Sequence, residues 1–406
     1  MKFSINKKTL LTVFAVIILC IFSFYLGLSF KAMPLYALKE DTTAKEYNKD
    51  LESLLEVKDY IKKKFVRDIP DSTLIEGAIK GMVESLKDPY SVYMDKNEFE
   101  DFVTSINGSF EGVGLSLGVD EKTKNIIVIS PIEGTPAHKA GILPRDVIVR
   151  VDKVDLRGKS LDEAVKLLRG KKGTKVTVYV ERPGIKDLLK FELIRDNIKI
   201  RTVKSEMIEG QIGYIKITSF DTYTPQELNE ALKNLKDKKI KGLILDLRNN
   251  PGGALDSAVK VADILLGKGL IVYTEDKNKN RLEEFYSDES KVEIPFVVLI
   301  NENSASAAEI VAGAVKDFKA GLLIGEKTFG KGTVQELVPL AGGGGIKLTI
   351  AKYYLPSGRS IEGEGIIPDV VIKAEEQSAY ATSFEKDAQL KKAVEVLRAK
   401  IKTGSN

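Results

Sequence analysis

The fold of this chain is decided by Gly242-Leu243-Ile244-Leu245-Asp246-Leu247-Arg248-Asn249-Asn250-Pro251-Gly252-Gly253. The first five residues of the stretch are typical of a buried strand, and a helical pattern begins after its last residue. Further strands are predicted at 213–217 and 296–300, and further helices at 225–235 and after Ser306. Alternating strands and helices predict an α/β layer architecture for this part of the chain.

The turn at the end of the quoted strand carries candidate oxyanion-binding groups. A glycine turn between a strand and a helix leaves backbone N–H groups free, so Gly252 and Gly253 are suited to hold an oxyanion. The alternative is an ordinary strand-to-helix turn.

A serine stands at the start of another predicted helix. Asn303-Ser304-Ala305-Ser306-Ala307-Ala308-Glu309 leads into apolar residues with helical spacing, from Ile310 to Phe318. Ser306 would present its hydroxyl at the positive end of that helix, and its small neighbours would leave room for a substrate carbonyl. The alternative is that Ser304 or Ser306 only caps the helix.

The base that activates this serine has to be a lysine, because the chain contains 1 His. His138 lies in Pro136-Ala137-His138-Lys139-Ala140-Gly141, far along the chain from Ser306. We therefore do not expect a Ser-His-Asp arrangement.

Lys331 is the candidate base, because Gly330 and Gly332 leave its side chain uncrowded. Gln335 would point to the same side if the segment is a strand, and could then orient the amine. A base must be neutral, and burial lowers the pKa of a lysine by up to about 3 to 5 units. One alternative is a surface lysine in a turn. Another is a phosphate-binding loop, which fails because Gly332 stands where a metal-binding hydroxyl is required.

Residues 9–30 form the only long apolar run in the sequence. About 20 apolar residues suffice to cross a bilayer as a helix. Three lysines precede the run, so we expect a single-pass protein of the cell membrane whose catalytic part is extracytoplasmic. A cleaved secretory signal at 1–31 is the alternative. Cys20, the only cysteine, lies inside this run, so the exported part has no disulfide.

The rest of the chain divides into four predicted parts. They are a helical N-terminal region at 40–95, a β-rich domain at 96–184, the α/β core at 185–374 and a C-terminal helix at 375–406. The terminal helices are amphipathic, so a homodimer formed through them is a further expectation. The 62 basic and 58 acidic residues are dispersed, which excludes nucleic acid as a partner. No cluster of His or Cys is available for a metal, and we expect no cofactor.

The β-rich part resembles a bacterial PDZ domain. The resemblance rests on Gly134-Thr135-Pro136-Ala137, Ala140-Gly141-Ile142, Asp146-Val147-Ile148 and Gly170-Lys171-Lys172-Gly173-Thr174. It implies that the backbone amides of Val113, Gly114 and Leu115 hold the carboxylate of a captured peptide, which adds to the sheet as a strand. Arg169 is a candidate for relaying PDZ occupancy to the core, against the alternative of a solvated arginine. A purely structural PDZ insert is the other alternative.

From about Leu74 to Asp369 the chain resembles the carboxyl-terminal processing proteases, also called tail-specific proteases. The shared motifs occur in family order: Phe110-Glu111-Gly112-Val113-Gly114, the stretch quoted first, the Ser306 segment, Gly330-Lys331-Gly332 and Gly358-Arg359-Ser360-Ile361. The similarity implies a multidomain α+β chain with an N-terminal transmembrane helix, a helical N-terminal region, a PDZ domain and a crotonase-like α/β protease core.

The same resemblance implies the roles of the site residues. Ser306 is the nucleophile, Lys331 the general base and Gln335 its orienting partner. The oxyanion site draws on the amide of Ala307 and on the Gly252-Gly253 turn.

The implied activity is that of a serine endopeptidase that captures the free C-terminus of a protein or peptide substrate and then cleaves the chain, with signal transduction as an expected setting. Two other function classes are a non-catalytic PDZ scaffold and acyl chemistry on coenzyme A esters. The intact set of Ser306, Lys331 and Gln335 argues against the scaffold. The export segment and the PDZ domain argue against the coenzyme A esters.

Overall fold

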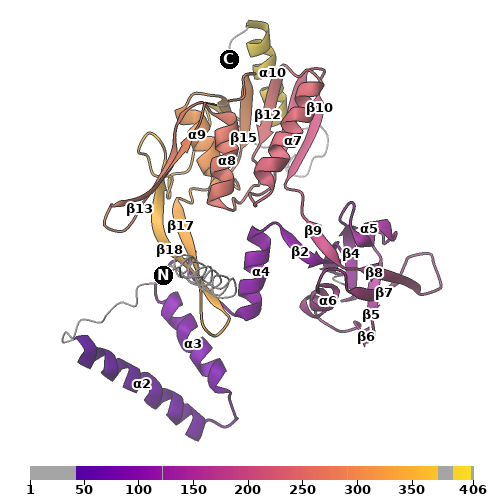
Figure 1. Cartoon of the computed structure of the whole chain (residues 1–406), viewed down its shortest axis with the longest axis vertical. Helices are drawn as coiled ribbons and strands as arrows, with labels where there is room; N and C mark the ends of the chain where they lie inside the picture. Colours follow the sequence, from indigo (N-terminus) through magenta and orange to yellow (C-terminus); the bar gives the residue numbers. More distant parts are fainter. Residues whose placement is uncertain (1–42, 121, 290, 374–386, 404–406) are drawn as a thin grey trace, which may run out of the picture. The chain divides into compact units, whose positions relative to one another are not determined.

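The computed structural model describes residues 43–120, 122–289, 291–373 and 387–403 (Figure 1). The chain divides into two compact units, Met1–Ala78 and Ile79–Asn406. The predicted membrane or signal segment at 9–30 lies outside the described residues. Among the helices that the structure describes, none combines the length and the apolar composition needed to span a bilayer.

The first unit contains helix α2 (Thr43–Lys64) and the first half of α3 (Asp71–Glu84). Lys58 and Lys62 pair with Asp71 at 3.2 and 2.6 Å, so a basic helix end meets an acidic helix start, as the two helix dipoles favour. Both helices fall within the region predicted to be helical at 40–95. The homodimer through the terminal helices stays a prediction.

The predicted PDZ region of the second unit is an antiparallel sheet with two short helices. The strands lie in the order β3 (Leu115–Val119), β4 (Ile126–Pro131), β5 (Val147–Val151), β7 (Lys175–Glu181) and β8 (Leu189–Ile194), with β6 (Val154–Asp155) paired to β5. The helices are α5 (Pro136–Lys139) and α6 (Leu161–Leu168). Ser160 and Glu163 form a capping box that starts α6. Strand β8 lies beyond the boundary drawn at residue 184 and pairs with β7 along its whole length.

A short ladder joins this sheet to the rest of the second unit. Strand β2 (Ser109–Gly112) enters the sheet region and pairs antiparallel with β9 (Asp196–Lys199), which leaves it. Helix α4 (Lys96–Ile106) precedes β2. Neither α4 nor this ladder is predicted from the sequence.

The α/β core contains a six-stranded sheet. Its order is β10 (Val203–Ile208), β11 (Ile212–Ile217), β12 (Gly242–Asp246), β15 (Phe296–Ile300), β16 (Leu322–Gly325) and β19 (Val370–Val371). Only β10 runs antiparallel to its neighbour among these strands. The predicted layer architecture is therefore confirmed.

Helices cover both faces of this sheet (Figure 1). One face packs against α7 (Thr224–Asp237), α8 (Leu255–Leu265) and α9 (Ala307–Asp317), and the other against α10 (Ala388–Thr403). Strand β12 is buried at every position, since Leu243 and Leu245 face the first layer while Ile244 faces α10. Burial on both faces explains why this strand is a continuous apolar run.

A second, antiparallel sheet lies in the same unit and is absent from the sequence prediction. It consists of β1 (Val92–Met94), β18 (Gly345–Tyr354), β13 (Gly269–Glu275) and β14 (Arg281–Ser287), with β17 (Thr333–Pro339) also paired to β18. Pairing of β1 with β18 brings the loop before β1 to the strands that follow Lys331. The Thr349 N–H donates to the hydroxyl of Ser91 in that loop at 3.0 Å.

Candidate active site

Ser306 stands immediately before helix α9, which begins at Ala307 as predicted. Its φ of 53° and ψ of −117° form a backbone conformation that residues with a side chain rarely adopt. Strain of this kind persists only where the surroundings fix the residue. Residues 307 to 315 are all buried, so the helix start is held firmly with its positive end at the serine.

Glu309 joins the serine segment to the lysine segment. Its buried carboxylate accepts the Ser306 N–H at 2.8 Å and the Lys331 N–H at 2.9 Å on the same oxygen, Oε2. The other oxygen accepts the Thr328 hydroxyl at 2.5 Å and the Gly330 N–H at 2.7 Å. Burial raises the pKa of this carboxyl, while its hydrogen bonds favour the charged form and oppose the rise. One carboxylate thus holds both candidate catalytic segments.

Lys331 lies in the loop before β17 and is partly buried. Its Nζ lies 4.5 Å from the centroid of the Tyr90 ring, within the range of a cation–π contact. Burial, and after it the positive charge of Lys347, lowers the pKa of this amine. Three carboxylates act in the opposite direction, those of Asp88, Glu362 and Glu309. The net lowering of the pKa is the direction that a lysine base requires.

Gln335 lies in β17 and does not contact the Lys331 amine. Its Nε2 donates instead to the hydroxyls of Thr333 at 2.9 Å and Thr349 at 3.4 Å. The strand begins only at Thr333, so Lys331 lies outside it and the expected alignment of residues four apart does not apply. Within the described residues, the amine makes no hydrogen bond to Ser306 or to Gln335. The structure therefore brings the segments together and leaves the lysine side chain on Tyr90.

Tyr353 of β18 lies next to the segments that carry Ser306 and Lys331. Its hydroxyl donates to the backbone carbonyl of Lys331. Burial raises the pKa of this phenol, and a hydrogen bond with the Ser306 side chain opposes the rise. Tyr353 therefore links β18 to the loop that carries Lys331.

The glycine turn after β12 lies directly against Ser306. A Cβ on Gly252, whose φ is 101°, would stand 2.8 Å from the Ser306 Cβ, 2.9 Å from the Ala305 carbonyl oxygen and 3.0 Å from the Ala307 nitrogen. Only glycine allows this approach. The N–H of Gly252 is not free, because it donates to the Asn250 side chain at 2.8 Å.

Two other amides of the predicted oxyanion site have N–H groups that are free to donate. In the described part of the chain, the N–H groups of Gly253 and Ala307 donate to no acceptor. Gly253 has a φ of 144°, and a Cβ there would stand 2.0 Å from the Phe220 carbonyl oxygen. The turn can therefore offer one amide, and the start of α9 a second.

The alternative role of helix cap does not fit Ser304. Its hydroxyl donates to the Leu247 carbonyl at 2.8 Å and accepts the Asn301 N–H at 3.0 Å. It links the loops that follow β12 and β15.

Three residues of the site were missed from the sequence: Glu309, Tyr90 and Tyr353. A glutamate three residues after a serine at a helix start is the capping-box pattern, and this signal would have indicated Glu309. Nothing local indicates the two tyrosines, because both reach the site through the unpredicted second sheet.

Three family descriptions match parts of the chain. Residues 18–98 match the N-terminal domain of the activating protease CtpB, and residues 127–182 match a PDZ domain. Residues 211–372, which contain Ser306, Glu309, Lys331 and the glycine turn after β12, match peptidase family S41.

Relatives match over most of the chain. The carboxy-terminal-processing protease of Bartonella bacilliformis is 40% identical over 358 residues, which cover 86% of this chain and 82% of that protein. This chain belongs to peptidase family S41. The carboxy-terminal processing protease CtpA of Bacillus subtilis is 45% identical over 311 residues, and the match spans 76% of this S41 chain and just under two thirds, 66%, of that protein.

A solved structure is also similar to this S41 peptidase. The photosystem II D1 C-terminal processing protease is 30% identical, with 83% of this chain and 94% of that chain covered and a TM-score of 0.49. The predicted family, with its PDZ domain, and the predicted class of serine-type peptidase are confirmed by the family and relative matches.

The predicted peptide-binding residues of this S41 peptidase lie beside the edge strand β3. Gly114 has a φ of 81°, and a Cβ there would stand 2.3 Å from the Thr135 side chain. The carbonyl oxygens of Val113 and Gly114 accept the N–H groups of Ala137 at 2.9 Å and Ile132 at 3.0 Å. Among the described residues, the N–H groups of Val113 and Gly114 have no acceptor. Two amides beside an unpaired edge are therefore available.

Arg169 ends helix α6 of the PDZ domain and contacts a different element. Its guanidinium pairs with Asp101 of α4 and lies 5.5 Å from the centroid of the Phe110 ring. The side chain is 38% exposed, so the contact is a surface one.

In the described ranges, no group of three or more His, Cys, Asp or Glu side chains is arranged to hold a metal ion.

Proposed function

We propose that this S41 peptidase is a serine endopeptidase in which Ser306 and Lys331 form the catalytic pair, and that it cleaves extracytoplasmic proteins after its PDZ domain captures their C-terminus. The observation that carries the proposal is the shared oxygen of Glu309, which accepts the backbone N–H of both residues. Two segments that are separate in sequence are thereby fixed within reach of each other. The same contacts count against the alternative of a non-catalytic PDZ scaffold.

The residues suggest a sequence of proton transfers. For attack, the Lys331 amine leaves the Tyr90 ring, accepts the Ser306 proton and so raises the nucleophilicity of the oxygen. The oxyanion of the tetrahedral intermediate accepts hydrogen bonds from the amides of Gly253 and Ala307. Lys331 then gives its proton to the leaving amine. Water, deprotonated by the same lysine, hydrolyses the acyl-enzyme and restores the serine.

Gln335 has a supporting role in this proposal. Its side-chain amide lies on Thr333 and Thr349, at the base of the loop that carries Lys331. A rotation of this side chain would let its oxygen accept a hydrogen bond from the amine once the amine has turned toward Ser306.

The activity is expected to rise with pH through the lowered pKa of Lys331, because only the neutral amine accepts the serine proton. Lys347→Met should move this rise to higher pH, since it removes a positive charge that lowers the pKa. The measurement is kcat/KM against pH for a quenched fluorescent peptide. Exposed Lys327 provides a matched control, Lys327→Met, which should leave the midpoint in place. A midpoint that stays in place or falls in Lys347→Met would contradict the lysine base.

PDZ capture is supported by the free amides of Val113 and Gly114 beside an open sheet edge. A carboxylate would accept charge-assisted hydrogen bonds from these amides, and the peptide backbone would pair with β3. The partly buried side chains of Leu115, Leu117 and Leu161 pack on the domain core nearby and suit an apolar C-terminal residue.

Substrates with a free, apolar C-terminus are expected to be cleaved at least about tenfold faster than the same chains with an amidated end, since each charge-assisted hydrogen bond contributes roughly 1.5 to 3 kcal/mol. The measurement is kcat/KM for the paired peptides. Gly114→Val should remove the difference, because its side chain would collide with Thr135. Equal rates for free and amidated tails with the unaltered enzyme would refute PDZ capture.

The cellular setting of the proposal rests on the apolar run at 9–30 and the lysines before it. We propose a single-pass membrane protein whose PDZ domain and core face the cell exterior, with Arg169 and Asp101 as a contact through which PDZ occupancy reaches α4. Digestion of the protein by trypsin added to intact spheroplasts tests the orientation.

A further inference from the structure

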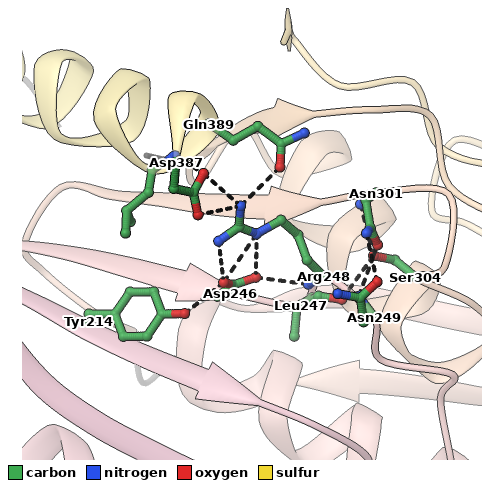
Figure 2. Close-up of polar contacts among 10 residues, drawn as sticks. Tyr214, Asp246, Leu247, Arg248, Asn249, Asn301, Ser304, Asp387 and Gln389 are labelled. Carbon is green, nitrogen blue, oxygen red and sulfur yellow. Dashed lines mark hydrogen bonds and ion pairs between the residues drawn. The ribbon is translucent and has the colours of Figure 1, made fainter. Parts of the chain in front are cut away.

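Arg248 connects the catalytic turn to the C-terminal helix α10. Its guanidinium donates to the Asp246 carboxylate, with a shortest distance of 2.7 Å, and to Gln389 Oε1 at 3.0 Å (Figure 2). The same group pairs with Asp387 at 2.8 Å. Arg248 is only 14% exposed and Asp246 is fully buried. A single buried cation therefore contacts both the end of β12 and the start of α10.

The positive charge of Arg248 is balanced by neighbouring carboxylates. Burial by itself would lower the pKa of the Arg248 guanidinium, but the carboxylates of Asp246 and Asp387 outweigh it and raise that pKa. Tyr214 also donates its hydroxyl to Asp246 at 2.7 Å. Asp387 accepts the N–H of Leu390 at 2.9 Å, so it caps α10 as well.

The residues on either side of Arg248 hold the segment that carries the nucleophile. Leu247 accepts the Ser304 hydroxyl at 2.8 Å, and Asn250 accepts the Ala305 N–H at 2.9 Å on its carbonyl oxygen. Asn249 exchanges hydrogen bonds of 2.9 Å with the Asn301 side chain (Figure 2). Asn249 also accepts a hydrogen bond from the Asn303 side chain at 3.0 Å, so each residue of the turn from 247 to 250 contacts either α10 or the Ser306 segment.

The turn leads directly to the oxyanion amides. Asn250 accepts the Gly252 N–H on its side chain, and Gly252 lies against Ser306 and Ala307. A Cβ on Gly252 would not fit at this contact, and Gly253 follows directly, so a displacement of the turn would move the Gly253 amide relative to the serine. Displacements of about 1 Å in an active site cost on the order of 100-fold in rate.

We infer that Arg248 is a positioning residue, and that α10 fixes the oxyanion turn against Ser306 through the contacts of Asp387 and Gln389 with this arginine. The inference rests on the proposed function. Stability alone does not account for the cluster, because a buried ion pair contributes little net stability. Helix α10 is already held on the sheet by an apolar face of Leu390, Ala393, Val394 and Leu397.

The test uses Asp387→Ser in the 406-residue chain, because serine still caps α10 but is too short to reach Arg248. We expect kcat for a quenched fluorescent peptide to fall about ten- to a hundredfold with KM unchanged, and labelling of Ser306 by a fluorophosphonate to slow in parallel. Asp387→Asn keeps both the cap and an oxygen for Arg248, and should retain kcat within about threefold. The melting temperature is measured for each variant.

The matched control is Arg398→Ala, which removes an exposed ion pair of α10 with Glu209 and should leave kcat unchanged. The inference is overturned if Asp387→Ser keeps kcat, or if its loss of activity only follows a fall in melting temperature. It is also overturned if Arg398→Ala loses as much activity. Ser306→Ala distinguishes failure of the proposed function from failure of this inference. If Ser306→Ala cleaves normally, the proposed function is wrong. If Ser306→Ala is inactive and Asp387→Ser is fully active, only the role of Arg248 is wrong.

Discussion

Ser306→Ala is expected to abolish peptide cleavage, with a loss on the order of 10⁶-fold in kcat, since removal of the nucleophile of a serine protease leaves only residual catalysis. The substitution keeps the Cβ and the backbone N–H that bonds to Glu309, so the fold should persist. Cleavage and circular dichroism of the same preparations give the measurement. Ser357→Ala, at an exposed serine, is the control and should be fully active. Cleavage by Ser306→Ala at a rate close to that of the control would assign the nucleophile elsewhere.

Lys331→Arg is expected to be as inactive as Ser306→Ala although it keeps the positive charge. A guanidinium does not lose its proton in proteins, so it cannot accept one from the serine. The cation–π contact with Tyr90 can be retained by arginine, which keeps the loop in place. Lys327→Arg, four residues earlier at an exposed position, makes the same chemical change away from the site and should leave activity intact. Substantial cleavage by the Lys331→Arg variant would rule out a lysine base.

Local signals in the sequence predict the parts of the site that follow from a single element. The start of α9 after Ser306 and the glycine turn after β12 are both visible as a change from an apolar run to helical spacing. The glycines of the turn are explained by contacts with Ser306 and Phe220 that leave no space for a Cβ. These predictions succeed because each depends on neighbours in the chain.

Predictions that depend on pairing between distant segments fail. Strand β1 pairs with β18 across more than two hundred residues, and no local pattern indicates which strands will meet. Tyr90 and Tyr353 reach Lys331 only through this sheet. The relation between Lys331 and Gln335 fails for a different reason: the strand begins at Thr333, so Lys331 lies in the loop before it and the alternation of side chains between two faces does not extend to the lysine.

Glu309 holds the backbone of Ser306 and of Lys331 through one oxygen, and it does so independently of the position of the lysine side chain. The backbone N–H groups of Ser306 and Lys331 stay bonded to this anchor whichever way the lysine side chain points. In the proposed mechanism the amine at the far end of four methylene groups takes up and releases the proton, while the backbone of Lys331 stays bonded to Glu309. If Lys331 is the base, as proposed, its amine can move from the Tyr90 ring to Ser306 by rotations about side-chain bonds alone, and no part of the core has to refold.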